Sequence, residues 1–297
     1  MKYVITGSLG NISKPLAQAL ITAAQDVTII TSKQENVAAI EALGAIAAVG
    51  SVEDLAFLTK TFTGADTVYT MVPPTYSATD WKAWIASIGN NYTEAIKAAG
   101  IKYVVNLSSI GGNLNDGTGP ITGLHRAEAA LNTLSDVHIK HLRPAYFYPN
   151  LFSNISLIKN AGIIGSNFAV TENKFPIVDP ADIAAVAAEE LLQLDFSGHS
   201  VRYIASDEVS TNAIAAEIGK AIGKPDLHWV PFTDEQAFGG MTQAGLSEEI
   251  AKNYVEMGAS INSGILSEDY WKNHPASLGR TKLADFAKVF AAAYNAN

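Results

Sequence analysis

The stretch that most constrains the fold is TGSLGNIS, residues 6–13, which directly continues a run of β-forming residues. The chain leaves this predicted strand through two glycines and enters a predicted helix at about Ile12. Gly7 supplies the φ freedom that so short a reversal needs. Gly10 has no side chain, so the backbone can approach a pyrophosphate, whose charge the unpaired N–H groups of the helix start would meet. The turn therefore predicts a dinucleotide-binding corner in the first βα unit.

The rest of the chain repeats this alternation of apolar β-runs and helical segments. Predicted strands lie at residues 2–6, 27–31, 45–49, 66–71, 102–109, 138–142 and 200–206. Such runs separated by helices are typical of parallel strands covered on both faces, so the expected fold class is α/β, with a doubly wound, Rossmann-like parallel sheet. The predicted parts are a dinucleotide-binding domain (1–150 and 176–205) and a smaller, mainly helical C-terminal lobe (151–175 and 206–297).

Composition narrows the classes of function. The absence of cysteine excludes disulfides, thiolate metal ligands and a cysteine nucleophile, and the scattered histidines predict no metal site. The formal net charge of -9, without a basic patch, predicts no nucleic-acid partner. No uncharged apolar run reaches the ~20 residues that cross a bilayer, so we expect no membrane partner. The residues after Met1 do not have the pattern of an export signal, so we expect a cytoplasmic location.

The end of the second strand is expected to select the cofactor. An acid there would accept hydrogen bonds from the ribose 2′-hydroxyl, whereas a base would neutralise a 2′-phosphate. This chain has Thr31-Ser32-Lys33 and no acid until Glu35, which favours NADP, with NAD as the alternative if Lys33 is an ordinary solvated lysine. The predicted cofactor-binding residues are Thr6, Gly7, Ser8, Gly10, Asn11, Ile12, Ser32, Lys33, Ser51, Val52, Met71, Val72, Pro73, Ser108 and Tyr146.

Six segments, in their order and spacing, resemble the NmrA-like proteins, a family of atypical short-chain dehydrogenases/reductases. These segments are VITGSLGNIS at the start, YVVNLSSIGG (103–112), HRAE (125–128), LRPAYFYPNLF (142–152), FPIVDPADIAAVAAEEL (175–191) and TNAIAAEIGKAIGKP (211–225). The resemblance implies a Rossmann-like domain that binds NAD(P) and a small C-terminal lobe that closes over the nicotinamide end. Some members look like NADPH-dependent reductases of quinones, dyes or other conjugated acceptors; others look like redox-sensing regulators without turnover.

The chain departs from the typical short-chain dehydrogenase at the catalytic positions. That chemistry uses a tyrosine as general acid and a lysine four residues later. No tyrosine lies between Val104 and Ala145, and His125 stands at the lysine position. The assisting serine corresponds to the pair Ser108-Ser109. Without the tyrosine, carbonyl–alcohol interconversion loses its proton donor, whereas hydride delivery to a conjugated acceptor needs mainly orientation and a proton from water.

His125 allows two interpretations. It lies near the start of a predicted helix, where the dipole disfavours its protonated form, and on one face with Glu128, which favours that form. A neutral imidazole would donate to a substrate carbonyl or to the nicotinamide ribose, and the alternative is a structural histidine that ties down the loop before its helix. The predicted catalytic residues are His125, Ser109 and Tyr148.

Two further segments end parallel strands and are expected at the ligand crevice. Tyr146 and Tyr148 alternate with Phe147, so we expect both phenols to point one way and to wall a flat acceptor; the alternative is packing between the lobes. The loop 71–76, stiffened by prolines, is expected beneath the nicotinamide-side ribose. Ser51 replaces the aspartate that relatives carry near the adenine, which leaves the backbone of Val52 for that contact.

The sequence thus predicts an NAD(P)H-dependent oxidoreductase that reduces a small conjugated or quinone-like acceptor, its small-molecule partner. An alternative is an NAD(P)-binding redox-sensing regulator that works through a protein partner. A sugar-nucleotide epimerase or dehydratase is a third reading, against which the absent tyrosine argues.

Overall fold

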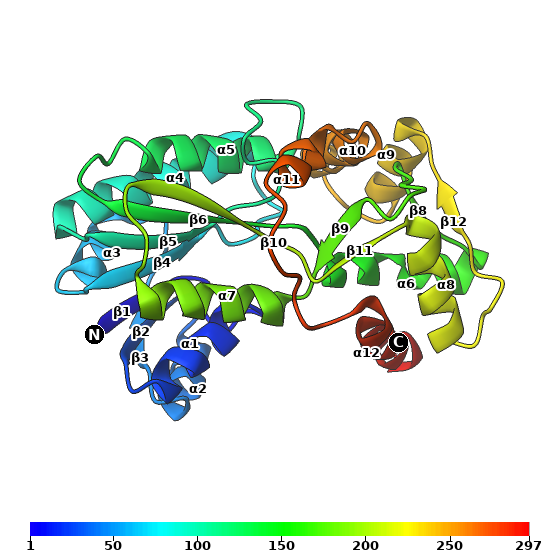
Figure 1. The fold of residues 1–297 in the computed structure, drawn as a ribbon. Helices are drawn as coiled ribbons and strands as arrows, with labels where there is room; N and C mark the ends of the chain where they lie inside the picture. Colours follow the sequence, from blue (N-terminus) through cyan, green and yellow to red (C-terminus); the bar gives the residue numbers. More distant parts are fainter. Residues whose placement is uncertain (297) are drawn as a thin grey trace.

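A seven-stranded parallel sheet forms the centre of the computed structural model, which describes residues 1–296 (Figure 1). Its strand order is β3-β2-β1-β4-β5-β6-β10, and every pair is parallel. The strands are β1 (Lys2–Ile5), β2 (Asp26–Thr31), β3 (Ile46–Val49), β4 (Thr67–Met71), β5 (Tyr103–Leu107), β6 (His138–Pro144) and β10 (His199–Ile204). The order reverses between β1 and β4, which is where a doubly wound sheet opens its ligand crevice. The predicted Rossmann-like fold class is confirmed.

Helices cover both faces of this sheet because successive strand residues point to opposite sides. Ile5, Ile29 and Tyr69 pack into one apolar core, whereas their neighbours Val4 and Val68 pack into another. The helices over the first face are α1 (Ser13–Thr22), α2 (Val37–Ala42) and α7 (Pro180–Gln193). The helices over the second face are α3 (Leu55–Phe62), α4 (Trp81–Ala99) and α5 (Pro120–Leu131).

The remaining elements lie beyond the carboxyl ends of the sheet strands (Figure 1). A three-stranded sheet has the order β11 (Asp207–Val209), β9 (Phe175–Val178), β7 (Tyr146–Phe147), and a two-stranded sheet pairs β8 (Ile164–Ser166) with β12 (Trp229–Pro231). The helices are α6 (Ile155–Ala161), α8 (Thr211–Ala221), α9 (Asp234–Gln243), α10 (Glu248–Asn262), α11 (Glu268–Lys272) and α12 (Leu283–Ala296). Three short 3-10 helices are η1 (Gln34–Asn36), η2 (Tyr148–Asn154) and η3 (Ile265–Ser267). The predicted domain boundaries stay a prediction, since the three-stranded sheet draws on both predicted parts.

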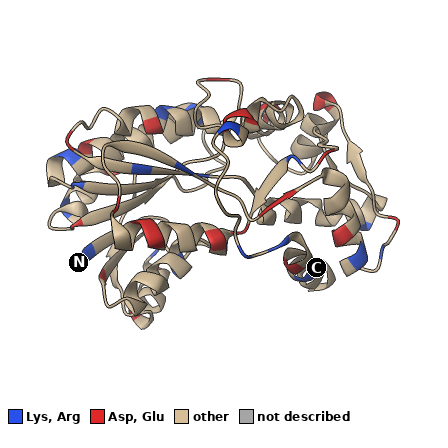
Figure 2. Cartoon of the chain, in the orientation of Figure 1, with Lys and Arg blue, Asp and Glu red and all other residues tan. Residues whose placement is uncertain are grey.

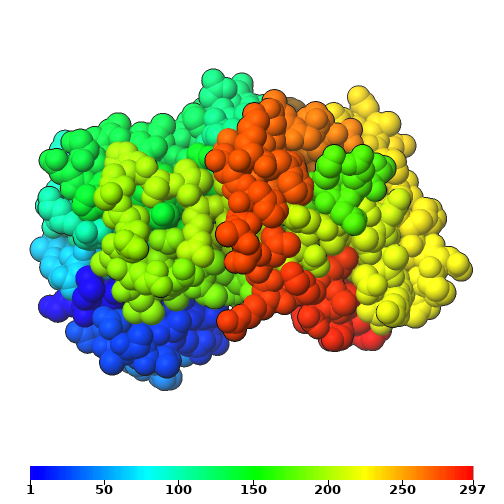
Figure 3. Space-filling model, viewed as in Figure 1, coloured from blue at the N-terminus to red at the C-terminus, as the bar shows by residue number. Residues whose placement is uncertain are grey.

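A segment of residues 273–282 returns the chain across the front of the molecule from α11 to α12 (Figure 3). The buried carboxylate of Asp182 holds it, accepting from the N–H groups of Arg280 and Thr281 at 3.1 and 3.0 Å and from Ser206 Oγ at 2.6 Å. Acidic and basic residues are interspersed along the fold (Figure 2). Among residues 1–296, no helix combines the length and the hydropathy that a bilayer-spanning segment needs.

Candidate functional site

The turn after β1 reverses the chain through two consecutive positive φ angles, 90° at Gly7 and 54° at Ser8. A side chain on Gly7 would collide with Ser13 Oγ and crowd Met71, so both conformation and space require glycine there. Ser13 is buried, and its hydroxyl donates to the carbonyl of Thr6 at 2.8 Å. That bond explains why serine fits where the dinucleotide-binding pattern has its third glycine.

Helix α1 begins at this turn without a side-chain cap, with Ile12 at its N-cap position. The N–H groups of Asn11 and Ile12 have no hydrogen-bond acceptor within the described residues. By contrast, Asp80 caps α4 and Asp179 caps α7, each by accepting from the first turn of its helix. Gly10 is exposed and leaves the approach to these amides open. Free amides at an uncapped helix start suit a diphosphate, so the residues present fit a dinucleotide.

A polar cluster lies where β2 ends. Ser8 Oγ donates to Thr31 Oγ1 at 2.9 Å, and Asn36 Nδ2 donates to these two oxygens at 3.0 and 3.2 Å. Ser32 next to it is exposed, and Lys33 is exposed with Nζ 3.7 Å from Glu35 Oε1. Sequence reasoning missed Asn36, whose only signal was a polar side chain shortly after the strand.

The predicted adenine-side residues follow β3. Ser51 is exposed, and its Oγ accepts from the N–H of Glu53 at 3.1 Å. Asn91 of α4 donates through Nδ2 to the carbonyls of Val52 and Glu53 at 3.2 and 3.0 Å. The carbonyl of Val52 is therefore engaged, and its N–H is the backbone group left for a ligand. Asn91 was not among the predicted residues, because it lies in the middle of a helix far along the chain.

The ends of β1 and β4 are joined by a buried hydroxyl. Thr6 Oγ1 accepts from the N–H of Met71 at 2.8 Å, and Tyr92 donates to the Met71 carbonyl at 2.7 Å. Val72 and Pro73 continue from this junction and are half-buried. Thr6 thus fixes the spacing between the glycine turn and the loop after β4. These two segments lie on either side of the point where the strand order reverses.

His125 lies near the start of α5 and holds the preceding loop. Its Nδ1 is 2.9 Å from the carbonyl oxygen of Gly112. A carbonyl only accepts, so Nδ1 carries a proton and donates it to Gly112. The Nδ1 N–H is thus engaged with the loop, as the structural interpretation of His125 expects, and a catalytic role for His125 stays a prediction.

The two serines that follow β5 lie in different surroundings. Ser108 Oγ is buried and has no hydrogen-bond partner in the described part of the chain, whereas Ser109 is half-buried. A side chain on Gly112 would lie 3.0 Å from Ser108 Oγ and 2.7 Å from Glu128 Oε1, so the loop packs tightly over both. An unpaired buried hydroxyl at the end of a sheet strand is the kind of group that a ligand satisfies.

Buried charge connects α5 with the far edge of the sheet. Arg143 of β6 donates from Nε and Nη2 to the two carboxylate oxygens of Glu128 at 3.0 and 2.6 Å, and from Nη1 to Tyr203 at 3.1 Å. Tyr203 donates in turn to Asp269 at 2.5 Å. Burial lowers the pKa of Arg143, but the Glu128 carboxylate outweighs it and keeps the guanidinium charged.

The two predicted phenols lie in different surroundings, because the strand-like alternation stops at Phe147. Tyr146 is half-buried in β7, with its ring 5.1 Å from that of Phe175, and it borders a cavity of about 600 Å³. Tyr148 begins η2, is fully buried and stacks on Phe286 at 4.9 Å. Burial raises the pKa of both phenols. Only Tyr146 has the partial exposure that a contact with a ligand needs in this conformation.

The sequence and the fold were compared with those of known proteins. The NmrA-like family matches residues 2–269. The NAD(P)H azoreductase of Xenophilus azovorans is 24% identical over 297 residues, 99% of each chain. The crystal structure of the Citrobacter sp. triphenylmethane reductase complexed with NADP(H) has a TM-score of 0.76 at 18% identity, covering 98% of this chain and 100% of that chain. A nucleoside-diphosphate-sugar epimerase from Staphylococcus aureus has a TM-score of 0.78 at 16% identity, covering 97% and 100%. Reductase and epimerase alike therefore share the fold.

Proposed function

The chain belongs to the NmrA-like family, and from that premise we propose that it is an NAD(P)H-dependent oxidoreductase that reduces a small conjugated or quinone-like acceptor. The observation that carries the proposal is the uncapped start of α1, where the N–H groups of Asn11 and Ile12 have no acceptor among the described residues. Both the azoreductase and the triphenylmethane reductase are named as reductases that use or bind NADP(H) or NAD(P)H, which supports the same chemistry here.

Different residues along the edge of the sheet bind different parts of the cofactor. The amides of Asn11 and Ile12 bind the diphosphate, and the Ser8, Thr31 and Asn36 cluster with Lys33 lies where the adenosine 2′ position is expected. When bound, the reduced nicotinamide supplies a hydride, which carries two electrons and one proton. The remaining proton of the reduction comes from water.

The acceptor is assigned to the side of Tyr146. The cavity of about 600 Å³ beside it is also lined by Ile110, which follows β5, and by Phe175 and Trp271. This volume lies within the range of small-molecule sites, and aromatic walls suit a flat, conjugated molecule. His125 keeps the β5–α5 loop in place and offers Nε2 to a hydroxyl donor such as a ribose.

The proposed reductase function is tested by measuring NADPH turnover. Purified protein is mixed with NADPH and a panel of quinones and azo dyes, and NADPH oxidation is followed by absorbance. We expect oxidation well above background with at least one acceptor, and its loss in Gly7→Ala, which distorts the phosphate turn. Background rates with every acceptor would count against the proposal.

The second candidate is a dinucleotide-binding redox sensor, favoured by one observation. The usual tyrosine donor is absent from α5, and the Nδ1 N–H of His125, at the lysine position, already donates to the carbonyl of Gly112. A sensor must bind NADP⁺ and NADPH with different affinities, because a ligand pair of equal affinity cannot shift a conformational equilibrium. Calorimetry that gave equal dissociation constants for the two would remove this candidate.

A further inference from the structure

The cavity beside Tyr146 has apolar and aromatic walls, among them the rings of Phe175 and Trp271. The polar side chains on its walls, such as Asn262 and Ser267, carry no charge. Charge is confined to residues that are exposed and therefore lie where the cavity opens to solvent. Among the described residues, these are Glu172, Lys174, Glu268 and Lys272, which we call the charged rim.

The charged rim consists of two ion pairs. Lys272 Nζ donates to Glu268 Oε1 at 2.6 Å across one turn of α11, and Lys174 Nζ lies 2.6 Å from Glu172 Oε2. The hydrogen bond to Glu268 raises the pKa of Lys272, and the hydrogen bond from Lys174 lowers the pKa of Glu172. Both pairs are therefore charged at neutral pH, and their two positive and two negative charges cancel.

Helix α11 carries one of these pairs and is anchored by residues that lie between the two members of the pair. Asp269 accepts from Tyr203 of β10, and the fully buried Tyr270 donates to Glu208 of β11, both at 2.5 Å. Trp271 packs edge-on against Tyr270, with ring centroids 5.0 Å apart. The backbone that presents this pair to the cavity is therefore held to both the seven-stranded and the three-stranded sheet.

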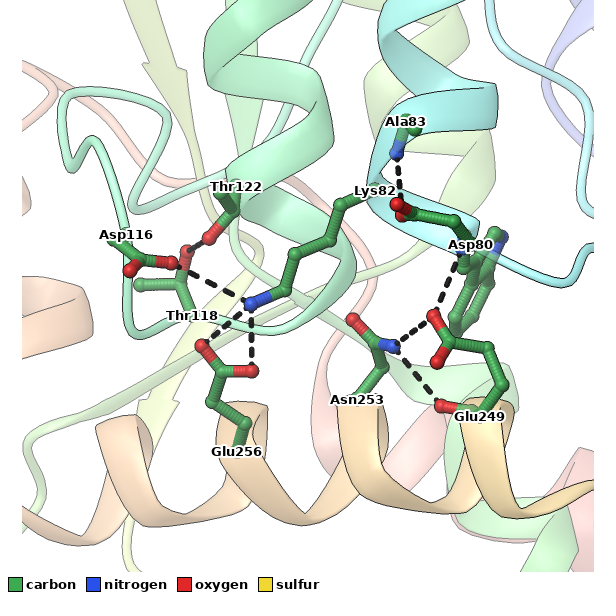
Figure 4. A network of polar contacts seen from close by, with 10 residues as sticks. Asp80, Lys82, Ala83, Asp116, Thr118, Thr122, Glu249, Asn253 and Glu256 are labelled. Carbon is green, nitrogen blue, oxygen red and sulfur yellow. Dashed lines mark hydrogen bonds and ion pairs between the residues drawn. The ribbon is translucent and has the colours of Figure 1, made fainter.

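Helix α10, whose last two residues line the cavity, is held against the start of α4 by polar contacts (Figure 4). Lys82 Nζ lies 2.7 Å from Glu256 Oε2 in this network. After α10, η3 packs so closely on the loop that follows β5 that a side chain on Gly111 would collide with Leu266. The wall formed by α10, η3 and α11 thus has fixed contacts with the part of the chain that is expected to bind the cofactor.

An acceptor that enters this cavity exchanges water for apolar and aromatic walls. A charged substituent on the acceptor would lose hydration there, and only a countercharge offsets that cost. Each charge of the rim already has its partner at 2.6 Å, so the rim offers no net countercharge to a ligand. An uncharged acceptor does not meet this cost, and its polar edge can contact uncharged side chains such as Asn262.

We propose that the acceptor of this site is an uncharged, flat conjugated molecule, and that Glu268 and Lys272 are specificity-determining residues whose mutual pairing disfavours charged acceptors. This inference rests on the proposed reductase function. It narrows the acceptor class from quinones and dyes in general to those without sulfonate or ammonium groups. The discrimination comes from a cost imposed on the charged competitor, and not from added contacts to the uncharged acceptor.

The experiment breaks the α11 pair from either side. Menadione is the uncharged acceptor, its 3-sulfonate carries a negative charge on the same ring system, and kcat/KM is measured for each with NADPH. Glu268→Gln leaves Lys272 without its carboxylate, so the ratio of kcat/KM for the sulfonate to kcat/KM for menadione should rise about fivefold. Lys272→Gln leaves Glu268 unpaired, so the same ratio should fall about fivefold. The different intrinsic reactivities of the two quinones cancel when these ratios are compared between proteins.

The opposite directions distinguish a charge effect from structural damage, because loss of the pair as a structural contact would change the ratio in the same direction in both variants. Glu248→Gln is the matched control, since it breaks the corresponding pair with Lys252 on α10, and neither residue lines the cavity. Its ratio should equal that of the wild type. Ratios that change less than about twofold in both α11 variants, or in the same direction in both, would overturn the inference and leave the reductase function standing.

A binding measurement separates this inference from the proposed function. Each quinone is titrated into the protein saturated with NADP⁺, and quenching of tryptophan fluorescence reports occupancy, because Trp271 lines the cavity. If neither quinone is reduced, the reductase proposal fails, and the dissociation constants decide the inference. Opposite shifts of their ratio in Glu268→Gln and Lys272→Gln would uphold the assignment of the cavity to an uncharged flat ligand. Equal shifts, or no binding of either quinone, would overturn it.

Discussion

The glycine turn and the contact between α5 and β6 are held by interactions of different kinds. At the turn, Gly7 and Ser13 depend on backbone conformation and on one hydrogen bond across seven residues. Between α5 and β6, Glu128 and Arg143 form a buried ion pair that continues through hydrogen bonds to Tyr203 of β10 and Asp269 of α11. Backbone geometry leaves amides free for a ligand, whereas buried charge must be paired to be tolerated. Changes at the turn should therefore impair mainly binding, and loss of one charge of the buried pair should impair mainly folding.

The largest expected effect is from Arg143→Met, which leaves the Glu128 carboxylate buried without its partner. Removing one member of a buried pair costs about 3–5 kcal/mol, and urea unfolding should show a loss of that size. The double variant Glu128→Leu/Arg143→Met removes both charges and should recover most of the stability. If the single variant lost less than about 1 kcal/mol, the contact between α5 and β6 would not depend on this pair, and the contrast with the turn would disappear.

The second prediction concerns His141, also in β6. Asn106 donates to Nδ1 at 3.1 Å and Nε2 donates to Asn132 at 3.0 Å, so the ring is neutral, and burial lowers its pKa to about 4. The unfolded imidazole takes a proton near pH 6.5, but the folded one does not. Stability is therefore present above that pH and is lost as the pH falls towards 4, by about 2 kcal/mol between pH 7 and pH 5.

Urea unfolding at the two pH values measures this loss, and His141→Gln is the matched control. Glutamine keeps polar atoms near Asn106 and Asn132 but does not titrate, so its stability should change less over the same range. Equal slopes for the two proteins would contradict the assignment of the titration to this buried ring. The glycine turn contains no such group, so NADP binding by the folded protein should not follow this slope.

The contrast between the two regions also explains how far the sequence could be used for prediction. Gly7 and Gly10 act within a few residues of the strand they follow, so their pattern alone indicated the turn, and the strand–helix alternation predicted the Rossmann-like sheet. Asn91 contacts the carbonyls of Val52 and Glu53, and Tyr254 packs on Trp81, across long stretches of chain, and nothing near either residue in sequence points to its partner. Tyr148 shows the limit of a local pattern. The alternation of Tyr146, Phe147 and Tyr148 suggested that both phenols point the same way, but the chain changes from a strand to a 3-10 helix at Tyr148.

The third prediction probes the turn itself. Gly7→Ala forces an alanine to a φ of 90° and against Ser13, which should cost about 1–2 kcal/mol of stability, less than the loss of the buried pair. NADPH affinity, measured by calorimetry, should fall more than tenfold because the amides of α1 shift. The double variant Gly7→Ala/Ser13→Gly removes the collision but keeps the φ strain, so it should recover part of the affinity. Full affinity in Gly7→Ala would show that the diphosphate does not bind at this turn.

The smallest expected effect is from Lys33→Ala, which tests whether Lys33 determines the preference for NADP over NAD. Lys33 is exposed and its contact with Glu35 is a surface ion pair, so Lys33→Ala should leave the unfolding midpoint unchanged. A 2′-phosphate bound beside Ser8 and Asn36 would recruit this lysine from Glu35, so NADP should bind about tenfold more weakly to the variant while NAD binds as before. Lys97→Ala, at the distant end of α4, serves as the charge control for both cofactors. Equal losses for NADP and NAD would mean that the hydroxyl and amide cluster, and not Lys33, determines the preference at this end of the crevice.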